Sequence, residues 1–552
     1  MASTGAQAQT DLETPLTLEA ITKGTIVVEN PQSDMQYSLN GGDKTAVTST
    51  AIQVNAGDKV QFFGNGTSIT SYSGTYITGG TADCYIYGNI MSLVDENGFA
   101  TATELTGDNT FTSLFDSNGQ LYNHATKKLV LPATTLSDNC YQYMFYGCAN
   151  LTTAPELPAT TLADNCYQYM FSDCENLTTA PELPATTLAQ SCYFEMFAGC
   201  ANLTTAPELP ATTLTESCYY SMFENCKRLT AAPALPATTL AQSCYEYMFS
   251  GCESLTTAPE LPATTLAESC YEYMFQECTN LTTAPELPAT TLTKYCYYKM
   301  FSGCTNLNSV TCLATDISAL DATTDWLENV AATGTFTKAA GASWTIDSPS
   351  GIPTGWTVND VQLVTITSAK MATLYFDKAL KIPAGVKVYY CSGIDETKDY
   401  NVITKEITDA IPANTGVFLS GEAGNYLFTV TDATVSAITD NIMEGTTEEI
   451  TVTPRQVLTL GHDSKGRLGF HYFTGTTIPA YKAYIPANKI SASASAISFF
   501  PIKYFEDEAT GISILPEVSK VENDAIYDLA GRKVKAATKG IFIKNGKKFI
   551  VK

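Results

Sequence analysis

Apolar residues recur at a fixed interval of 26 residues through the middle of the chain. One unit reads LPATTLADNCYQYMFSDCENLTTAPE, residues 157 to 182, and its LPATTL opening appears seven times. The openings lie at Leu131, Leu157, Leu183, Leu209, Leu235, Leu261 and Leu287. A constant period of this length predicts structurally equivalent turns of a solenoid, each burying its apolar face against its neighbours.

Comparison of the seven units separates fixed positions from variable ones. In the unit quoted above, the fixed side chains are Leu162, Cys166, Tyr167, Met170, Phe171, Cys174 and Leu177. Their intervals of four, one, three, one and three residues are typical of the apolar stripe of an amphipathic helix, which leaves the variable residues toward solvent. We therefore expect one helix per unit, with Thr160 or Thr161 as its N-cap.

The stretch before each predicted helix, LTTAPELP, favours a short strand because it is rich in threonine and closed by proline. Leu151, Ala154 and Leu157 are the inward candidates. Pro155 has no N–H and should shorten or bulge the strand. Stacked units would then form a parallel sheet on one side of the solenoid and a row of helices on the other.

The unit resembles the bacterial BspA-like leucine-rich repeats. These carry a phenylalanine, a cysteine three residues on, a leucine three further, and a strand closed by Ile-Pro or Leu-Pro; here Phe171, Cys174, Leu177 and Leu183-Pro184 match. The present unit is longer than is usual for that family and has Pro181 in its strand. The resemblance implies a surface-exposed adhesin or interaction protein of the Bacteroidetes type. The predicted fold class is an α/β leucine-rich-repeat solenoid, with a strand and a helix per repeat, flanked by β-sandwich domains.

The chain is long enough for several domains. Regions of period-two alternation between turn signals flank the repeats. We predict a disordered tail or signal remnant at 1–20, an N-terminal β-sandwich at 21–100, the solenoid with its caps at 101–360, an immunoglobulin-like β-sandwich at 361–505, a linker at 506–520 and a C-terminal β tail at 521–552. Ala6-Gln7-Ala8 would suit the end of a secretory signal.

Degenerate units mark both ends of the solenoid. Leu114-Phe115 stands in the Met-Phe position, with four extra residues before Leu131, and predicts a capping turn. Trp326-Leu327 occupies the same position at the other end. The three tryptophans, Trp326, Trp344 and Trp356, are predicted to cover that end, and a sugar-stacking platform is the alternative.

The last residues, IYDLAGRKVKAATKGIFIKNGKKFIVK, are similar to the C-terminal sorting modules of type IX secretion in Bacteroidetes. The matching residues are Asp528-Leu529-Ala530-Gly531-Arg532 and Lys539-Gly540-Ile541-Phe542. The resemblance implies export and attachment at the cell surface. A basic β-hairpin that closes the last domain is the alternative.

Fourteen of the 17 cysteines form pairs eight residues apart, one pair per unit, such as Cys166 and Cys174. On a helix this spacing separates the Cα atoms by about 12 Å, whereas a disulfide tolerates roughly 7 Å. We therefore expect buried free thiols, with disulfides between neighbouring units as the alternative. Without a Cys-x-x-Cys motif or a neighbouring histidine, no metal site is predicted.

Charge and motifs narrow the function further. The net charge of -25 argues against nucleic acid as a partner, and no apolar run is long enough for a transmembrane helix. The histidines, His124, His462 and His471, have no catalytic partner at a recognisable spacing, and no nucleotide-binding or hydrolase motif occurs. We expect neither an enzyme nor a cofactor.

Two rows of side chains are candidates for a binding face. A carboxylate row, Glu156, Glu182, Glu208, Glu260 and Glu286, occupies one repeat position and could attract a basic partner or stay a solvated row. The variable aromatics Tyr143, Tyr169, Tyr247 and Tyr273 would suit carbohydrate stacking. The tyrosine found in every unit, Tyr167 in the unit above, is expected beside the packed face.

These patterns predict a non-catalytic, secreted or surface-displayed binding protein, similar to an adhesin. The expected partner is a protein of the host or matrix, bound through many weak contacts that sum over the units. Carbohydrate binding and a purely structural spacer are the alternatives.

Overall fold

The structure is a computed structural model that describes residues 10–64, 74–346, 349–397 and 399–502, together with the backbone of five short strands between 512 and 551. The chain divides into two compact units, Met1–Asn359 and Asp360–Lys552. Within the described residues, no helix has the length and apolar character needed to cross a bilayer.

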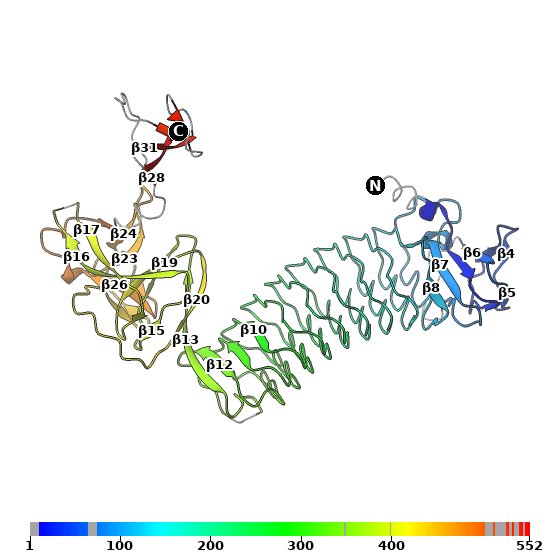
Figure 1. The fold of residues 1–552 in the computed structure, drawn as a ribbon, viewed down its shortest axis with the longest axis horizontal. Helices are drawn as coiled ribbons and strands as arrows, with labels where there is room; N and C mark the ends of the chain where they lie inside the picture. Colours follow the sequence, from blue (N-terminus) through cyan, green and yellow to red (C-terminus); the bar gives the residue numbers. More distant parts are fainter. Residues whose placement is uncertain are drawn as a thin grey trace. The chain divides into compact units, whose positions relative to one another are not determined.

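A seven-stranded sheet opens the first unit, in the order β4-β3-β6-β1-β7-β8 with β9 also paired to β7 (Figure 1). β8 and β9 pair with β7 in parallel, and this parallel pairing leads into the repeats. The inner side chains of the seven-stranded sheet, such as Val60 and Phe62, belong to the same apolar core as the repeats. The strands are β1 (Thr17–Ala20), β3 (Gln36–Leu39), β4 (Thr45–Ala46), β6 (Lys59–Phe63), β7 (Cys84–Asn89), β8 (Leu121–Asn123) and β9 (Leu129–Val130); β2 (Gly24–Ile26) pairs separately with β5 (Ile52–Val54), and the 3₁₀ helix η1 (Ile90–Leu93) follows β7.

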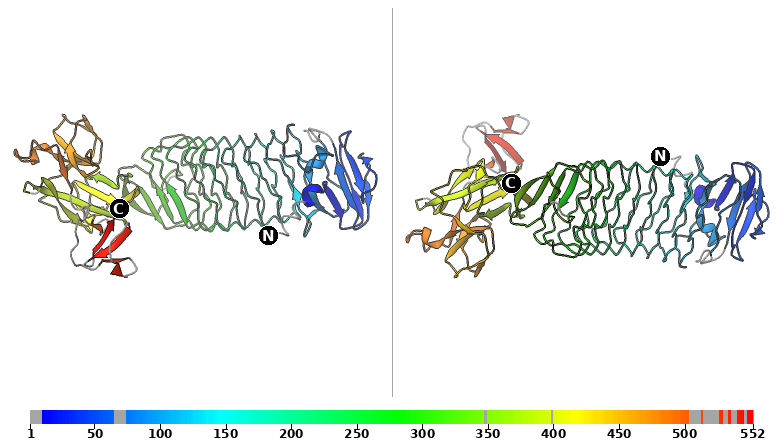
Figure 2. Two further views of the ribbon diagram at one scale, coloured as in Figure 1. Left: turned by 90° about the horizontal axis from the view of Figure 1, so that it is seen from above. Right: turned by 90° about the horizontal axis from the view of Figure 1, so that it is seen from below.

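The prediction of a helix in each unit is wrong. Residues 131–304 contain no helix, and the segment in question is a chain of overlapping turns that stack from unit to unit (Figure 2). Between residues 139 and 148, each even-numbered N–H donates to the carbonyl three residues earlier, as from Met144 to Tyr141 (3.2 Å). Each odd-numbered N–H donates to the next unit, as from Phe145 to Met170 (2.9 Å). Backbone polar groups are therefore all paired, but half of the bonds join neighbouring units.

Backbone conformation shows why a helix does not form. Every fourth residue is left-handed, with φ of 57° at Asn139, 56° at Tyr143 and 65° at Gly147, and a right-handed helix cannot contain such residues without breaking. The backbone therefore repeats every four residues. This repeat directs five side chains into the core: Cys140, Tyr141, Met144, Phe145 and Cys148. That period is close enough to the 3.6 of a helix to produce the same apolar intervals in the sequence.

The strand side of each unit is also shorter than predicted. Several neighbouring units are joined by isolated parallel bridges, such as Thr153 to Thr179. Thr161 bridges Thr135 and Thr187, although it was expected to cap a helix. Leu151 and Leu157 are buried as predicted, and Ala154 is half-buried. Continuous strands appear only toward the end of the described repeats, where β10 (Thr283–Leu287), β11 (Ser309–Cys312) and β12 (Thr335–Ala339) pair in parallel.

The inward side chains stack into columns that run through the units. Phe145 lies parallel to Phe171 with ring centroids 5.6 Å apart, and Tyr141 to Tyr167 at 5.7 Å. Phe115 begins the phenylalanine column, as the predicted capping turn requires. All seven fixed positions except the first are fully buried in the unit of residues 157 to 182; Leu162 is half-buried.

Tryptophans close the far end of the columns, as predicted. Trp326 is buried, continues the tyrosine column from Tyr297, and donates its indole N–H to Gly351 (3.1 Å). Trp344 stacks on Trp326 at 5.3 Å, and the buried Trp356 donates to Ala331. Because these rings pack on one another and on the core, they cover the end of the solenoid rather than face solvent.

The second unit is built of short, mostly antiparallel strands around a core that includes Phe418, Leu458, Phe470 and Phe500. One sheet has the order β14-β19-β16-β17 and another β21-β26-β23-β24-β27. β13 pairs with β20 in antiparallel orientation, and the two-stranded sheets are β15-β18 and β22-β25. The bounds are β13 (Thr357–Ile366), β14 (Met371–Leu374), β15 (Leu380–Lys381), β16 (Val386–Asp395), β17 (Asn401–Ile407), β18 (Ala410–Ile411), β19 (Val417–Gly421), β20 (Gly424–Thr429), β21 (Glu444–Thr446), β22 (Ile450–Thr451), β23 (Val457–His462), β24 (Leu468–Tyr472), β25 (Thr477–Ile478), β26 (Lys482–Pro486), η2 (Ala487–Lys489) and β27 (Phe499–Pro501).

The end of the chain forms a further sheet in the order β28-β32-β31-β29-β30. Its strands are β28 (Ile512–Ser513), β29 (Ile526–Asp528), β30 (Lys533–Val534), β31 (Gly540–Lys544) and β32 (Lys547–Val551). Of the residues similar to a sorting signal, 529–532 and 539 lie outside the described residues, as do residues 6–8 and most of the predicted linker.

Candidate binding surfaces of the repeat region

The predicted carboxylate row lies exposed on the strand side of the solenoid: Glu156, Glu182, Glu208, Glu260 and Glu286. At its first member, Lys128 Nζ lies 3.0 Å from the Glu156 carboxylate. Desolvation and the neighbouring Glu260 carboxylate raise the pKa of Glu286. The like charges of Glu260 and Glu286 therefore disfavour one another, and a cationic partner would relieve that repulsion.

The predicted tyrosines lie half-buried on the turn side, which is the segment of stacked turns, residues 139 to 148 in the first unit and their equivalents in the others. Tyr143 stacks on Tyr169 with centroids 4.4 Å apart, and Tyr247 on Tyr273 at 4.3 Å. The structure links these two pairs through residues that the prediction missed. The intervening rings are Phe194 and Tyr220, stacked at 4.4 Å, and Tyr298 follows Tyr273.

A signal for the complete row is present in the sequence. Each unit has one aromatic residue at one of two adjacent positions: the second in the units of Tyr143, Tyr169, Tyr247 and Tyr273, and the first in the units of Phe194, Tyr220 and Tyr298. Examination of either position alone shows gaps. Because both positions lie on the same turn, the rings form one continuous aromatic row along the solenoid.

In three of the seven units the position beside the aromatic residue holds a carboxylate that is partly withdrawn from water: Glu195, Glu246 and Glu272. Burial raises the pKa of Glu195 to about 7, although the hydrogen bond that its carboxylate accepts from the Tyr169 hydroxyl (3.1 Å) acts to lower it. Burial and the Glu272 carboxylate likewise raise the pKa of Glu246 to about 7. The pKa of Glu272 is also raised, chiefly by burial. These groups would gain from a positive charge brought by a partner.

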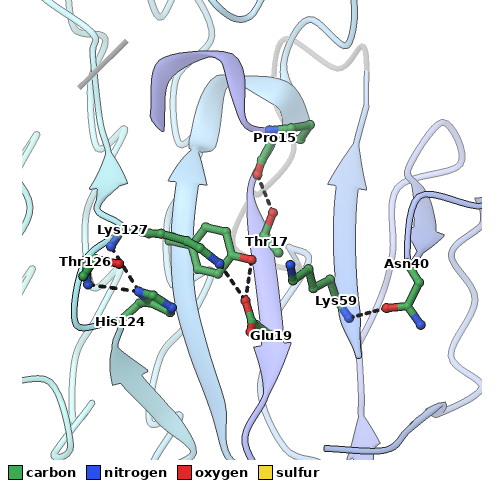
Figure 3. Close-up of polar contacts among 9 residues, drawn as sticks. Pro15, Thr17, Glu19, Asn40, Lys59, His124, Thr126 and Lys127 are labelled. Atoms are coloured by element: carbon green, nitrogen blue, oxygen red, sulfur yellow. Dashed lines mark hydrogen bonds and ion pairs between the residues drawn. The ribbon is translucent and has the colours of Figure 1, made fainter. Parts of the chain in front are cut away.

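A second polar cluster lies on the N-terminal sheet, where Glu19, His124 and Lys127 approach one another (Figure 3). The Glu19 carboxylate accepts hydrogen bonds from Lys127 Nζ (2.8 Å) and from the Tyr87 hydroxyl (2.7 Å). Burial alone would raise the pKa of Glu19, but these two bonds lower it overall. Lys127 Nζ also lies 4.0 Å from the centre of the Tyr87 ring. The cluster is internally paired and anchors the loop that contains Lys127.

His124 holds that loop from within. Its Nδ1 accepts the backbone N–H groups of Thr126 and Lys127, each at 3.1 Å, so its proton lies on Nε2. Burial, followed by the charge of Lys127, lowers the pKa of His124. The imidazole is therefore a neutral N–H donor at physiological pH.

A cavity of about 790 Å³ lies between this loop and the first full repeat. Its apolar lining includes Ile86, Leu131 and Leu151, and its polar lining includes His124 and Lys128. Nothing in the sequence prediction pointed to this cavity, although the four extra residues before Leu131 mark its place.

The thiol prediction is confirmed: all 17 cysteines are free and buried. The reason given for it was wrong, since no helix separates the two thiols of a unit. Each second thiol instead donates to the carbonyl of a phenylalanine in the previous unit, as Cys174 does to Phe145 (3.1 Å). Within the described residues, no group of three or more potential metal ligands occurs.

Comparison with known proteins agrees with the repeat pattern. The family described as the BspA type leucine rich repeat region matches six copies over residues 118–230 and 217–322. No curated protein and no solved structure shows a detectable match. Residues 118–322 are therefore similar to BspA-type leucine-rich repeats, and in this chain they are built from stacked turns in place of helices.

Proposed function

We propose that the chain is a non-catalytic binding protein, displayed at or secreted from the cell surface, that holds a protein ligand on the turn side of its repeats. BspA-type repeats favour a protein-interaction or surface role, and they are generally not enzymes. In this proposal residues 361–505, immunoglobulin-like in the prediction, and the tail at 521–552 space or attach the repeat region. The ligand is a protein of the host or matrix.

The observation that supports the turn side is the separation of constant and variable positions there. Constant side chains such as Met170 and Phe171 are buried in every unit. The other positions of the same segment, such as Gln168 and Tyr169, vary between units and reach the surface. A rigid, hydrogen-bonded scaffold thus presents a surface that can change without loss of the core. Tyrosine is enriched at the energetic centres of protein interfaces, and here six of the seven rings in the aromatic row are tyrosines.

Charge favours a basic protein as the ligand. Half-buried carboxylates, Glu195, Glu246 and Glu272, lie beside the aromatic row with raised pKa values. The chain as a whole has a net charge of -25. Lysine or arginine side chains of a partner would compensate the carboxylates and lie against the tyrosine edges, and opposite charge would also speed association.

Carbohydrate stacking is less well supported on this surface. A sugar packs its C–H groups on an open ring face, but within each pair the inner faces are occupied by the neighbouring ring at 4.3–4.4 Å. The tryptophans are likewise packed at the end of the core. A purely structural spacer needs only the buried constant positions. It gives no reason for the aromatic row or for the carboxylates beside it.

The test compares two surfaces with matched changes. Immobilised extracellular and matrix proteins, and a glycan array, are probed with the full chain and with two double variants. Glu246→Gln with Glu272→Gln changes the turn side, and Glu182→Gln with Glu208→Gln changes the same number of carboxyl groups on the strand side. A saturable protein ligand weakened about tenfold only by the first pair supports the proposal. Loss only with the second pair, or a glycan ligand alone, contradicts it.

A further inference from the structure

The cavity beside the first repeat is a consequence of an insertion. Phe115 and Phe145 occupy equivalent positions but are 30 residues apart, against 26 in the other units. The extra residues form the loop from His124 to Lys128, between β8 and β9, and this loop lines the cavity. Between the loop and the first repeat remains a space of about 790 Å³, within the range of small-molecule sites.

Side-chain hydrogen bonds hold the cavity open. At one end of the loop, Asn123 takes the place of a strand partner: its Oδ1 accepts the N–H groups of Thr152 (2.8 Å) and Thr153 (3.0 Å), and its Nδ2 donates to the Thr153 carbonyl. Inside the loop, His124 Nδ1 accepts two backbone N–H groups. At the other end, Lys127 is fixed to Glu19. The loop is therefore braced away from the space and does not collapse into it.

The lining combines apolar side chains, called the leucine floor below, with basic residues. Leu12, Ile86, Leu129, Leu131 and Leu151 supply the floor. His124, Lys127 and Lys128 are the basic residues of the lining. The His124 ring and the Lys127 ammonium pack against Tyr87, which is not part of it. Two acids also line the space, but Asp11 is buried and accepts the backbone N–H of Lys128, and Glu156 is 86% exposed at the outer edge. This arrangement suits a molecule with an apolar body and an anionic head.

Lys128 is the residue available to receive such a head. Its ion pair with Glu156 joins side chains that are 71% and 86% exposed, and pairs of that kind contribute little to stability. The ammonium can exchange Glu156 for a ligand carboxylate at small cost. Lys127, in contrast, stays with Glu19 and the Tyr87 ring and contributes its charge from a fixed position.

We propose that this cavity binds a small amphiphile, an aliphatic monocarboxylate whose chain lies on the leucine floor and whose carboxylate pairs with Lys128. The site is separate from the proposed protein-binding surface on the turn side. Neither depends on the other, since a carboxylate ligand and a basic protein are bound by different residues.

The experiment titrates the full chain with dodecanoate by calorimetry, with dodecanol and dodecylamine as chains of equal length and different head. Lys128→Ala should weaken dodecanoate binding about tenfold, through loss of one charged hydrogen bond. Lys227→Ala is its matched control, because Lys227 forms the same 3.0 Å ion pair with Glu253 away from the cavity. Only the first of these variants should change binding.

A second pair of variants fills the space. Ala154 lines the cavity, and Ala180 is the half-buried equivalent in the next unit, outside it. Ala154→Phe should abolish binding while Ala180→Phe leaves it unchanged, and comparison of their melting curves separates occlusion from misfolding. Absence of saturable binding, equal binding to Ala154→Phe, or equal or tighter binding of dodecanol or dodecylamine would overturn the proposal.

Discussion

Replacement of Gly147 by alanine distinguishes stacked turns from a helix by the sign of its effect. Gly147 has φ of 65°, in the left-handed region. A Cβ built there meets no atom closer than 3.4 Å, the nearest being Ser117 Oγ. The substitution therefore tests the backbone conformation with little interference from packing.

The two structures predict opposite changes in the free energy of unfolding. In the stacked turns, alanine must adopt the left-handed conformation, which costs about 1–2 kcal/mol. In a helix, the same replacement would remove the entropy penalty of glycine and stabilise the protein by about 1 kcal/mol. Gly147→Asn should cost less than alanine because asparagine tolerates this conformation, and Asn225 occupies the equivalent position with φ of 57°.

Urea unfolding followed by far-ultraviolet circular dichroism measures both variants against the parent chain. The expected order of midpoints is parent, then Gly147→Asn, then Gly147→Ala. A midpoint for Gly147→Ala at or above that of the parent would refute the turn structure. The spectrum of the parent should also lack the strong helical minima that seven helices would produce.

Three further predictions follow from burial and charge. Leu255→Ala should cost about 2–5 kcal/mol because the side chain is wholly buried, whereas Glu260→Ala, at an exposed position, should leave the urea midpoint unchanged; equal losses would contradict the assignment of the two sides. Glu246→Gln should stabilise the fold at pH 8 by about 1–2 kcal/mol, a discounted share of the pKa rise to about 7. The charged form is the disfavoured one, so this gain should shrink as pH falls from 7 to 4.5 and the native carboxyl takes up its proton; a gain independent of pH would count against it, with Glu208→Gln as the exposed control. The thiols should resist 5,5′-dithiobis(2-nitrobenzoate) at pH 8 until urea unfolds the chain, because burial raises their pKa, to about 12 at Cys140; rapid labelling of the native protein would disprove this.

Prediction from the sequence succeeded where burial alone decides the pattern. The fixed positions, the register of the units, the capping turn at Phe115 and the covering role of Trp326 all follow from which side chains avoid water. The backbone conformation was wrong because a period of four and a period of 3.6 are hard to separate over ten residues. The distinguishing information lay in asparagine and glycine at the two ends of the segment, as at Asn139 and Gly147, although Tyr143 between them is left-handed as well.

The candidate surfaces were predictable in part for a related reason. Tyr143 and Tyr247 were found because they vary between units, but Phe194 and Tyr220 were missed because the aromatic residue shifts by one position. On a helix such a shift would rotate the side chain by about 100° and break the row. The cavity at Lys128 depends on how an insertion is braced by Asn123 and His124, which only the folded chain shows.

The direction of the bonds between units explains why the two ends of the solenoid differ. In the turn segment each odd-numbered N–H points to the following unit, so this side of the stack offers carbonyls at its start and N–H groups at its end. Ile77 donates to the Leu114 carbonyl at the start (2.7 Å), and Asp325 donates to the Pro349 carbonyl at the end (2.7 Å). Unpaired groups of either kind would be costly where they are buried, and where exposed they would template the addition of another chain. One end therefore needs donors and the other acceptors, and a single capping sequence cannot serve both.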